Sequence, residues 1–405
     1  MTNTLQQSIS RMRLGTAGAT LTFAVMLALG MVTTRAAQTQ TFTVLHSFAG
    51  SPDGTKPYGG LARNAKGNLY GTTNLGGDSN CNPPYGCGVV FQVDTSGKET
   101  VYSLPGGADG LLPYAGLIGD AAGNLYGTTY FGGLYNGGTV FKLDTSDTET
   151  VLYKFNGSSD GQYPAGGLLR DKAGNLYGTT QYGGSPGNGT VFTLSTTGTE
   201  TVLHSFTGYP SDGAYPTYTS LLRDAKGNLY GVTEEGGASN EGMVYKLSPN
   251  GTLTVLHNFI GGTRDGCYPY GTPAMDKNDN LYGTTRQCGS HHHGIVWKVS
   301  SKGTETVLHN FAGGSSDGAG PYTGVIMDAT GNLYGDTYGG GTYGLGTVYE
   351  LNTKGALTLL HSFAGYPSDG ANPMGGVIRD TKGNLYGTTL MGGNIGCGTV
   401  WKLTP

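Results

Sequence analysis

The chain has 405 residues, of which 75 are glycine and 17 are proline, whereas only 12% are charged. Glycine recurs too often along the chain for a fold built from long helices, so an all-α protein is excluded. A formal net charge of −4 excludes the basic surface of a nucleic-acid-binding protein, and 27 tyrosines exclude a disordered chain. We therefore expect a β-rich globular protein that does not bind nucleic acid.

The N-terminal stretch has the order of a secretory signal peptide. Two arginines precede an apolar run over residues 14–32, which leads into small residues at Ala36 and Ala37. We predict that residues 1–37 are a signal peptide and that residues 38–405 form one domain without a membrane span. An uncleaved anchor is the alternative, because the apolar run is almost long enough to cross a bilayer. The mature protein is expected to be a monomer in the periplasm, on the cell surface or outside the cell.

Internal repetition is the dominant feature of the rest of the chain. The segment Gly-Asn-Leu-Tyr-Gly-Thr-Thr recurs with small changes at intervals of 51 to 56 residues. A period of this length, repeated seven times, indicates a propeller or an array of repeats. The seven copies begin at Gly67, Gly123, Gly174, Gly227, Asp279, Gly331 and Gly383.

Each repeat contains four short β-type segments. In the third repeat they cover residues 165–171, 175–180, 189–194 and 200–206, and Gly, Pro, Asn and Asp clusters separate them. Four antiparallel strands in each of seven units predict an all-β fold, a seven-bladed β-propeller. We name the strands a, b, c and d from the channel outwards.

The two ends of the chain complete one repeat between them. Residues 42–48 read as a d strand that no a, b or c strand precedes, and residues 398–403 read as a c strand that no d strand follows. We expect the two segments to pair, which would close the ring and remove an exposed sheet edge.

The repeat resembles a known family. The order LYGTTxxGG, GTVFKL and ETVLHSF is similar to the GloVer-type tandem repeat over residues 41–405. This resemblance implies an exported bacterial propeller, at the cell surface or secreted, and brings no known catalytic residues. A more distant similarity to NHL and senescence-marker lactonase propellers implies a Glu, Asn and Asp metal set, which cannot be placed on this sequence.

Seven Asp-Gly pairs lie in the predicted d-to-a crossings, each followed by proline three or four residues later. Asp accepts backbone hydrogen bonds and Gly turns the chain, so we interpret the pairs as structural turns. A calcium site would need six to eight oxygens from one place, and seven separate loops lie too far apart. The pairs begin at Asp53, Asp109, Asp160, Asp212, Asp265, Asp317 and Asp369.

One position of the d strand carries histidine in five repeats and tyrosine in two. Both side chains have a flat ring with a polar tip, which predicts a partly buried slot with one hydrogen-bond partner rather than a metal site. The residues are His46, His204, His257, His309 and His361, with Tyr102 and Tyr153.

Departures from the repeat gather in two neighbouring units. The b-to-c loops and d-to-a crossings of a blade lie on one face, so these residues are candidates for a ligand-binding rim. No cofactor is predicted, although histidine and carboxylate side chains together are possible ligands of a divalent metal ion. Three adjacent histidines cannot all face one ion. The alternative is a set of solvated loops without a function. The residues are Glu234, Glu235, Glu241, Arg264, Arg286, His291, His292 and His293.

The five cysteines predict a disulfide framework with one cysteine left over, in an oxidising compartment. None forms a C-x-x-C pair, which argues against structural zinc and thioredoxin-like chemistry. Cys267 and Cys288 lie in two loops on one face of the same blade, and we predict a disulfide between them. Cys81 and Cys87 flank a short loop and form a second candidate pair, with Cys397 as the alternative partner of Cys81.

Three functions remain open from the sequence. The first is a non-enzymatic binding module at the surface or outside the cell, with an extracellular polysaccharide or envelope proteins as partners, because tyrosine rings offer stacking faces for sugars. The second is a metal-assisted lyase or lactonase acting on a sugar derivative. The third is a structural envelope protein. Fold alone does not decide among them.

Overall fold

The computed structural model describes residues 40–405, so the predicted signal peptide at residues 1–37 lies outside the described part. Residues 41–404 form one unit in which every regular element is a β-strand. No helix of this part is long and apolar enough to cross a membrane.

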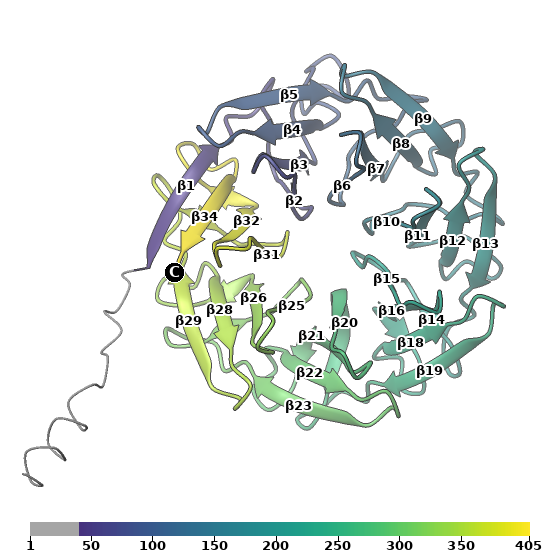
Figure 1. The fold of residues 1–405 in the computed structure, drawn as a ribbon, viewed down its shortest axis with the longest axis vertical. Helices are drawn as coiled ribbons and strands as arrows, with labels where there is room; N and C mark the ends of the chain where they lie inside the picture. The colour runs from purple at the N-terminus through teal and green to yellow at the C-terminus, as the bar shows by residue number, and fades with distance from the viewer. Residues whose placement is uncertain (1–39) are drawn as a thin grey trace, which may run out of the picture. The chain divides into compact units, whose positions relative to one another are not determined.

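Seven four-stranded antiparallel sheets circle a central channel, which confirms the predicted seven-bladed β-propeller (Figure 1). From the channel outwards, blade 1 is β2 (Ala62–Arg63), β3 (Leu69–Thr73), β4 (Val89–Val93) and β5 (Glu99–Ser103). Blade 2 is β6 (Ile118–Gly119), β7 (Leu125–Thr129), β8 (Thr139–Leu143) and β9 (Glu149–Lys154). Blade 3 is β10 (Leu169–Arg170), β11 (Leu176–Thr180), β12 (Thr190–Leu194) and β13 (Glu200–Ser205).

The remaining blades repeat the same order. Blade 4 is β15 (Leu222–Arg223), β16 (Leu229–Thr233), β18 (Met243–Leu247) and β19 (Leu253–Asn258). Blade 5 is β20 (Gly266–Met275), β21 (Leu281–Cys288), β22 (Ile295–Val299) and β23 (Glu305–Asn310). Blade 6 is β25 (Ile326–Met327), β26 (Leu333–Thr337), β28 (Thr347–Leu351) and β29 (Leu357–Ser362).

Blade 7 combines the two ends of the described chain. Its strand order is β31 (Ile378–Arg379), β32 (Leu385–Thr389), β34 (Thr399–Thr404) and β1 (Thr41–Ser47). The pairing of β1 with β34 is antiparallel and sets Phe42 opposite Leu403 and Ser47 opposite Thr399. The two terminal segments therefore lie side by side, as Figure 1 shows.

Three small ladders join the d-to-a crossings to the b-to-c loops. They pair β14 (Gly213–Ala214) with β17 (Glu235–Gly236), β24 (Gly318–Ala319) with β27 (Gly339–Gly340), and β30 (Gly370–Ala371) with β33 (Met391–Gly392). In blade 5 the same contact is part of the long strands β20 and β21, in which Gly266 pairs with Cys288. Both kinds of loop consequently lie on one face of the ring, as the sequence predicted.

The inner strands are shorter than predicted. Residues 165–171 were expected to form a strand, whereas β10 contains only Leu169–Arg170. Pro164 has no backbone N–H to donate. The blades also converge at the channel: a Cβ on Gly166 would lie 2.1 Å from the Thr219 carbonyl oxygen. Backbones of neighbouring blades contact each other here, which leaves no room for a regular ladder.

The Leu-Tyr-Gly core of the repeat is explained by packing within each blade. A Cβ on Gly178 would lie 2.7 Å from the ring of Phe192 on the next strand, so only glycine leaves space for that ring. Each blade places an aromatic residue of its c strand against the same glycine; the other six are Phe91, Phe141, Tyr245, Trp297, Tyr349 and Trp401.

The hydrophobic core consists of seven layers between adjacent blades rather than one central mass. One layer joins Val191 and Phe206 of blade 3 to Leu229 and Tyr245 of blade 4, all fully or almost fully buried. A rigid ring of this kind holds its loops in fixed positions on each face.

Both predicted disulfides are confirmed. Cys267 and Cys288 are bonded with a Cα–Cα separation of 5.4 Å, and Cys81 and Cys87 with 5.5 Å. Cys397, the alternative partner of Cys81, is a free thiol. Two disulfides fit a protein that is exported to an oxidising compartment.

Candidate functional site

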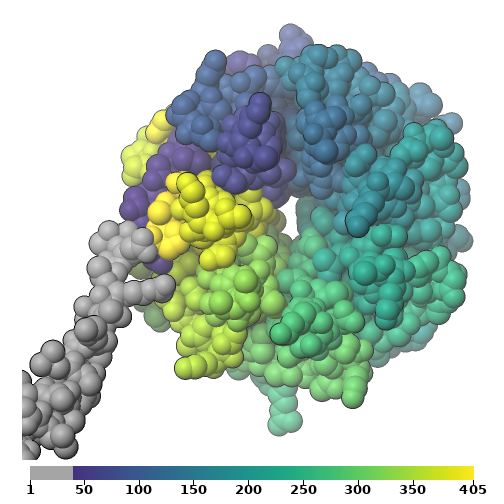
Figure 2. Space-filling view, in the orientation of Figure 1, coloured from purple at the N-terminus to yellow at the C-terminus, as the bar shows by residue number. Residues whose placement is uncertain are grey.

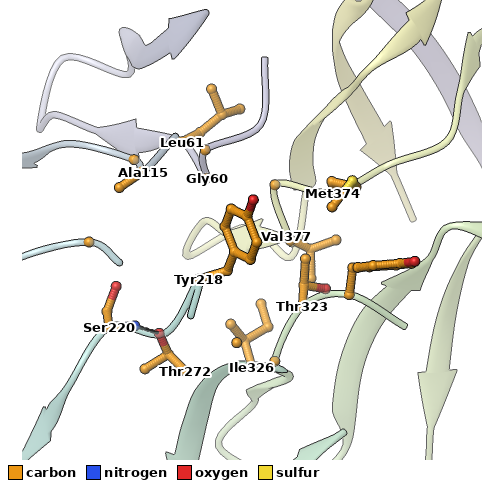
Figure 3. A pocket seen from close by; sticks show the side chains of 18 of the residues that line it. Gly60, Leu61, Ala115, Tyr218, Ser220, Thr272, Thr323, Ile326, Met374 and Val377 are labelled. Atoms are coloured by element: carbon orange, nitrogen blue, oxygen red, sulfur yellow. Dashed lines mark hydrogen bonds between the residues drawn. The ribbon is translucent and has the colours of Figure 1, made fainter. Parts of the chain in front are cut away.

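The channel holds a cavity of about 510 Å³ (Figures 2 and 3). Its wall is formed by the inner strands and the turns that precede them, with apolar side chains such as Leu61, Met275, Ile326 and Val377. Among the described residues that line it, none is Asp, Glu, His, Lys, Arg or Cys. The cavity can therefore hold neutral chemical groups, but its wall supplies neither a charge nor a metal ligand.

Tyrosine dominates one position at the entrance to each inner strand, close after the proline of the crossing. Four of these tyrosines line the cavity. Blade 3 has Ala165 at this position and blade 7 has Met374. The tyrosines are Tyr58, Tyr114, Tyr218, Tyr270 and Tyr322.

Tyr218 projects into the channel, as Figure 3 shows. Its backbone has a φ of 50°, a left-handed conformation that is rare for a bulky residue. Its ring stacks on that of Tyr270 in blade 5, with centroids 5.9 Å apart, and lies 5.9 Å from the ring of Tyr114 in blade 2. The rings of Tyr114 in blade 2 and Tyr218 in blade 4 can meet because blade 3, between them, has the small Ala165 at the position of the tyrosine.

Ten tyrosine rings form one connected group at this end of the channel, which we call the tyrosine belt. Neighbouring members have ring centroids between 4.8 and 6.0 Å apart, within the range of favourable aromatic contacts. The members are Tyr58, Tyr114, Tyr130, Tyr163, Tyr182, Tyr215, Tyr218, Tyr270, Tyr322 and Tyr338.

The residue that follows Leu-Tyr-Gly-Thr-Thr differs between blades, whereas the five residues before it are nearly constant. Four of these side chains hydrogen-bond the belt or each other. Tyr130 donates to Gln181 at 2.6 Å, Tyr270 donates to Glu234 at 2.6 Å, and Arg286 donates to Tyr270. The repeat thus keeps its strands constant and changes one position beside the belt. From blade 1 to blade 7 the residues are Asn74, Tyr130, Gln181, Glu234, Arg286, Tyr338 and Leu390.

Arg286 and Glu234 meet at the edge of the belt, as their placement on one rim predicted. Nη1 of Arg286 lies 3.9 Å from Oε1 of Glu234 and donates to the Tyr270 hydroxyl at 3.3 Å. The guanidinium also lies over the rings of Tyr268, Tyr270 and Tyr322, 5.3 to 5.5 Å from their centroids. Its buried Nε has no hydrogen-bond partner among the described residues.

Burial controls the protonation of the belt. Desolvation raises the pKa of Tyr58 and of Tyr114, and at Tyr270 the charge of Glu234 adds to the effect. Desolvation, followed by the charge of Glu234, also raises the pKa of Glu235. The hydroxyls of Tyr58, Tyr114 and Tyr270 therefore stay neutral at physiological pH and can donate hydrogen bonds.

The other candidates from the sequence are not brought into this group. Glu241 lies beside the Cys267–Cys288 disulfide, and one of its buried oxygens has no partner among the described residues. Arg264 is exposed in the turn before β20, and His291, His292 and His293 are exposed in the loop between β21 and β22. None of these four lines the cavity.

One departure from the repeat was missed. Asp336 replaces the first threonine of Leu-Tyr-Gly-Thr-Thr and is fully buried behind the channel wall, where the Thr323 hydroxyl donates to it. Burial raises its pKa to about 6. The change from LYGTT to LYGDT was visible in the sequence and could have identified it.

The histidines of the d strands and the Asp-Gly turns form one structural feature. Nε2 of His204 lies 2.9 Å from Asp212, and Nε2 of His361 lies 3.0 Å from Asp369. Asp212 also accepts from the backbone of Thr207, so it fixes the turn. The predicted half-buried slot with one partner is present at His204, His309 and His361.

Comparisons with solved structures support the fold. A streptogramin B lyase has a TM-score of 0.58 with 13% identity, covering 90% of this chain and 97% of that chain. Virginiamycin B lyase from Staphylococcus aureus has a TM-score of 0.58 with 14% identity, covering 90% and 99%. The extracellular domain of a hybrid two component system from B. thetaiotaomicron has a TM-score of 0.55 with 14% identity, covering 90% of this chain but 41% of that one. At these identities the likeness concerns the fold alone.

Sequence comparison identifies the family. No curated protein matches the chain significantly. The model of the Gloeobacter/Verrucomicrobia repeat matches residues 18–223, 81–270 and 217–405, which together cover nearly the whole chain. The expected GloVer-type resemblance is therefore confirmed, and the chain belongs to the Gloeobacter/Verrucomicrobia repeat family.

Proposed function

We propose that the protein is an exported binding module that takes a neutral saccharide at the tyrosine belt. The observation that carries the proposal is the concentration of aromatic rings and one variable blade position at a single end of the channel. Tyrosine pairs an apolar face with a polar tip, which suits the mixed apolar and hydroxylated surface of a sugar. Varied polar side chains on a rigid ring supply the specific hydrogen bonds of a ligand site.

Charge favours a neutral ligand over an acidic one. The cavity wall carries no charged residue among those described, and Arg286 at its edge is already opposed by Glu234. Glu235 adds a further carboxylate nearby. An acidic polymer would meet more like charge than opposite charge on this face.

The lyase or lactonase alternative has less support. Metal-assisted chemistry at the channel needs carboxylate or imidazole ligands in its wall, and the described wall offers neither. Glu234, at the edge of the belt, is engaged by Tyr270 and Arg286. Binding is therefore the function that the site supports best, and export is supported by the two disulfides.

Affinity electrophoresis tests the proposal with xylan, galactomannan and mixed-linkage β-glucan as neutral probes and alginate as the acidic one. We expect at least one neutral polymer to retard the protein and alginate to have no effect. Tyr114→Ala and Arg286→Ala should each weaken the affinity behind this retardation about five- to thirtyfold, because each removes a contact worth about 1–2 kcal/mol.

Tyr343→Ala is the matched control, since Tyr343 is 61% exposed and outside the belt. Circular dichroism checks that each variant is folded. The proposal fails if no neutral polymer retards the protein, or if Tyr343→Ala weakens retardation as much as Tyr114→Ala.

A further inference from the structure

The interface between blades 4 and 5 brings together three side chains that bind metals in other proteins. His257 lies on β19, Asp265 follows in the crossing to blade 5, and Glu305 begins β23. One ligand atom from each lies within 4.8 Å of the other two. This cluster lies between the outer strands, away from the tyrosine belt, and the proposed function does not depend on it.

The three groups do not satisfy one another. Nε2 of His257 is buried without a hydrogen-bond partner, 3.5 Å from Oδ2 of Asp265. Oε1 of Glu305 is also buried without a partner. Buried polar atoms in folded proteins normally have partners, so two orphan ligand atoms converging on one point indicate a missing binding partner.

At three other blade interfaces the equivalent histidine does have a hydrogen-bond partner. In the equivalent pairs His204–Asp212, His309–Asp317 and His361–Asp369, the closest approach of Nε2 to the carboxylate is 2.9 to 3.0 Å, and the imidazole is satisfied. At those interfaces the position of Glu305 is occupied by an apolar residue: Leu253, Leu357 or Phe42.

A second interface has the same residue types but a different geometry. Nε2 of His46 lies 3.3 Å from both carboxylate oxygens of Asp53 and 3.2 Å from Glu99. The imidazole is satisfied there by the protein itself. Among the described residues, an unpartnered imidazole beside two carboxylates is confined to His257, Asp265 and Glu305, whereas an unpartnered glutamate oxygen also occurs at Glu99, Glu149 and Glu200.

We propose that His257, Asp265 and Glu305 bind one divalent transition-metal ion of the zinc class, which bridges blades 4 and 5. One imidazole nitrogen and two carboxylate oxygens, with a water molecule as the fourth ligand, form a donor set that zinc accepts. Calcium requires six to eight oxygens and is not matched by three ligands that include a nitrogen.

The surroundings orient the ligands. The backbone N–H groups of Ile260 and Gly266 donate to the two oxygens of Asp265 at 2.8 and 2.7 Å, which fixes the carboxylate. The His257 side chain remains 17% exposed, so an ion can enter from solvent.

Zinc binding by the chelator-treated protein tests the proposal. All measurements use a background in which His291, His292 and His293 are replaced by alanine, because exposed imidazoles also bind zinc. Isothermal titration calorimetry gives the stoichiometry, and thermal melting gives the effect of the bound ion. We expect Glu305→Leu to bind one equivalent of zinc less than the background protein. The melting temperature of this variant should also rise less when zinc is added.

The repeat provides a matched control for the fold. Glu305→Leu should fold, because leucine already occupies the same position at Leu253 and Leu357. Equal zinc stoichiometry in the background protein and in Glu305→Leu overturns the proposal, as does binding of calcium in preference to zinc at this site.

Discussion

Glu200 provides a direct test of how the blade interfaces respond to pH. Its carboxyl group lies half-buried at the start of β13, and its Oε1 has no hydrogen-bond partner in the described structure. Burial, with a contribution from the charge of Asp160, raises the pKa of Glu200 to about 7 from an ordinary value of 4.5. The folded state thus holds this proton more tightly than the unfolded chain does.

The sign of the effect follows from that difference. Stability from the raised pKa is complete below pH 4.5 and is lost as the pH rises to about 7. The full shift corresponds to about 3 kcal/mol, which solvent screening of a half-buried group reduces to about 1–2 kcal/mol. Glu200→Gln cannot ionise, so it should be more stable than the wild type by about this amount at pH 8.

Urea unfolding at pH 4.5 and pH 8 measures the effect. At pH 4.5 the wild type and Glu200→Gln should have similar free energies of unfolding, so that the low-pH pair is the internal control. Glu200→Leu, which copies the residue at Leu253 and Leu357, should also be more stable than the wild type at pH 8. If the free energies of unfolding of the wild type and Glu200→Gln differ by the same amount at both pH values, the carboxyl group of Glu200 is not held in its neutral form.

Three further changes test the scaffold. Removal of residues 38–48 should lower the melting temperature and produce oligomers in light scattering, because it exposes the edge of β34; an unchanged monomer contradicts the closure of the ring. Cys267→Ser with Cys288→Ser should cost about 3 kcal/mol in urea unfolding, the entropy of the loop that the disulfide closes; no loss would show that the bond does not form. Gly178→Ala should cost about 1–3 kcal/mol through its clash with Phe192, and unchanged stability would refute this packing.

The sequence predicted the architecture because the repeat presents it seven times. The period predicted the strand order and the number of blades. The division of one repeat between the two ends of the chain predicted the pairing of residues 42–48 with the C-terminal strand. The inner strands were overestimated because backbone contact between blades ends them, as at Gly166, and no local pattern records that contact.

The site was predicted only in part. Glu234 and Arg286 were found because they differ from the consensus, and the structure pairs them. Asn74, Tyr130 and Gln181 occupy the equivalent position and were missed, because each looked like an ordinary loop residue within its own repeat. Comparing the same position in all seven repeats would have identified the ring that they form.

Contacts between blades were the least accessible to sequence reasoning. His257 and Glu305 lie almost one full repeat apart in the chain, so their proximity depends on how adjacent outer strands pack. The d-strand histidines were interpreted as structural, which agrees with the bonds of His204, His309 and His361 to aspartate, but the residue facing each histidine across the interface was not considered. That facing residue, glutamate or an apolar side chain, decides whether the histidine at that interface has a second carboxylate beside it.

Three kinds of repeat position follow from these results, and each has its own physical role. Positions that are constant in every blade, such as Gly178, are fixed by packing, because any side chain there meets an aromatic ring. Positions that hold either glutamate or an apolar residue, such as that of Glu305, set the chemistry of one interface without altering the strands. Positions that vary beside the channel, such as that of Arg286, change from blade to blade while the strands next to them stay nearly constant. In a ring with sevenfold repetition, a ligand with no such symmetry can be recognised only by residues of the last kind, which is why the tyrosine belt and its variable neighbours carry the proposed function.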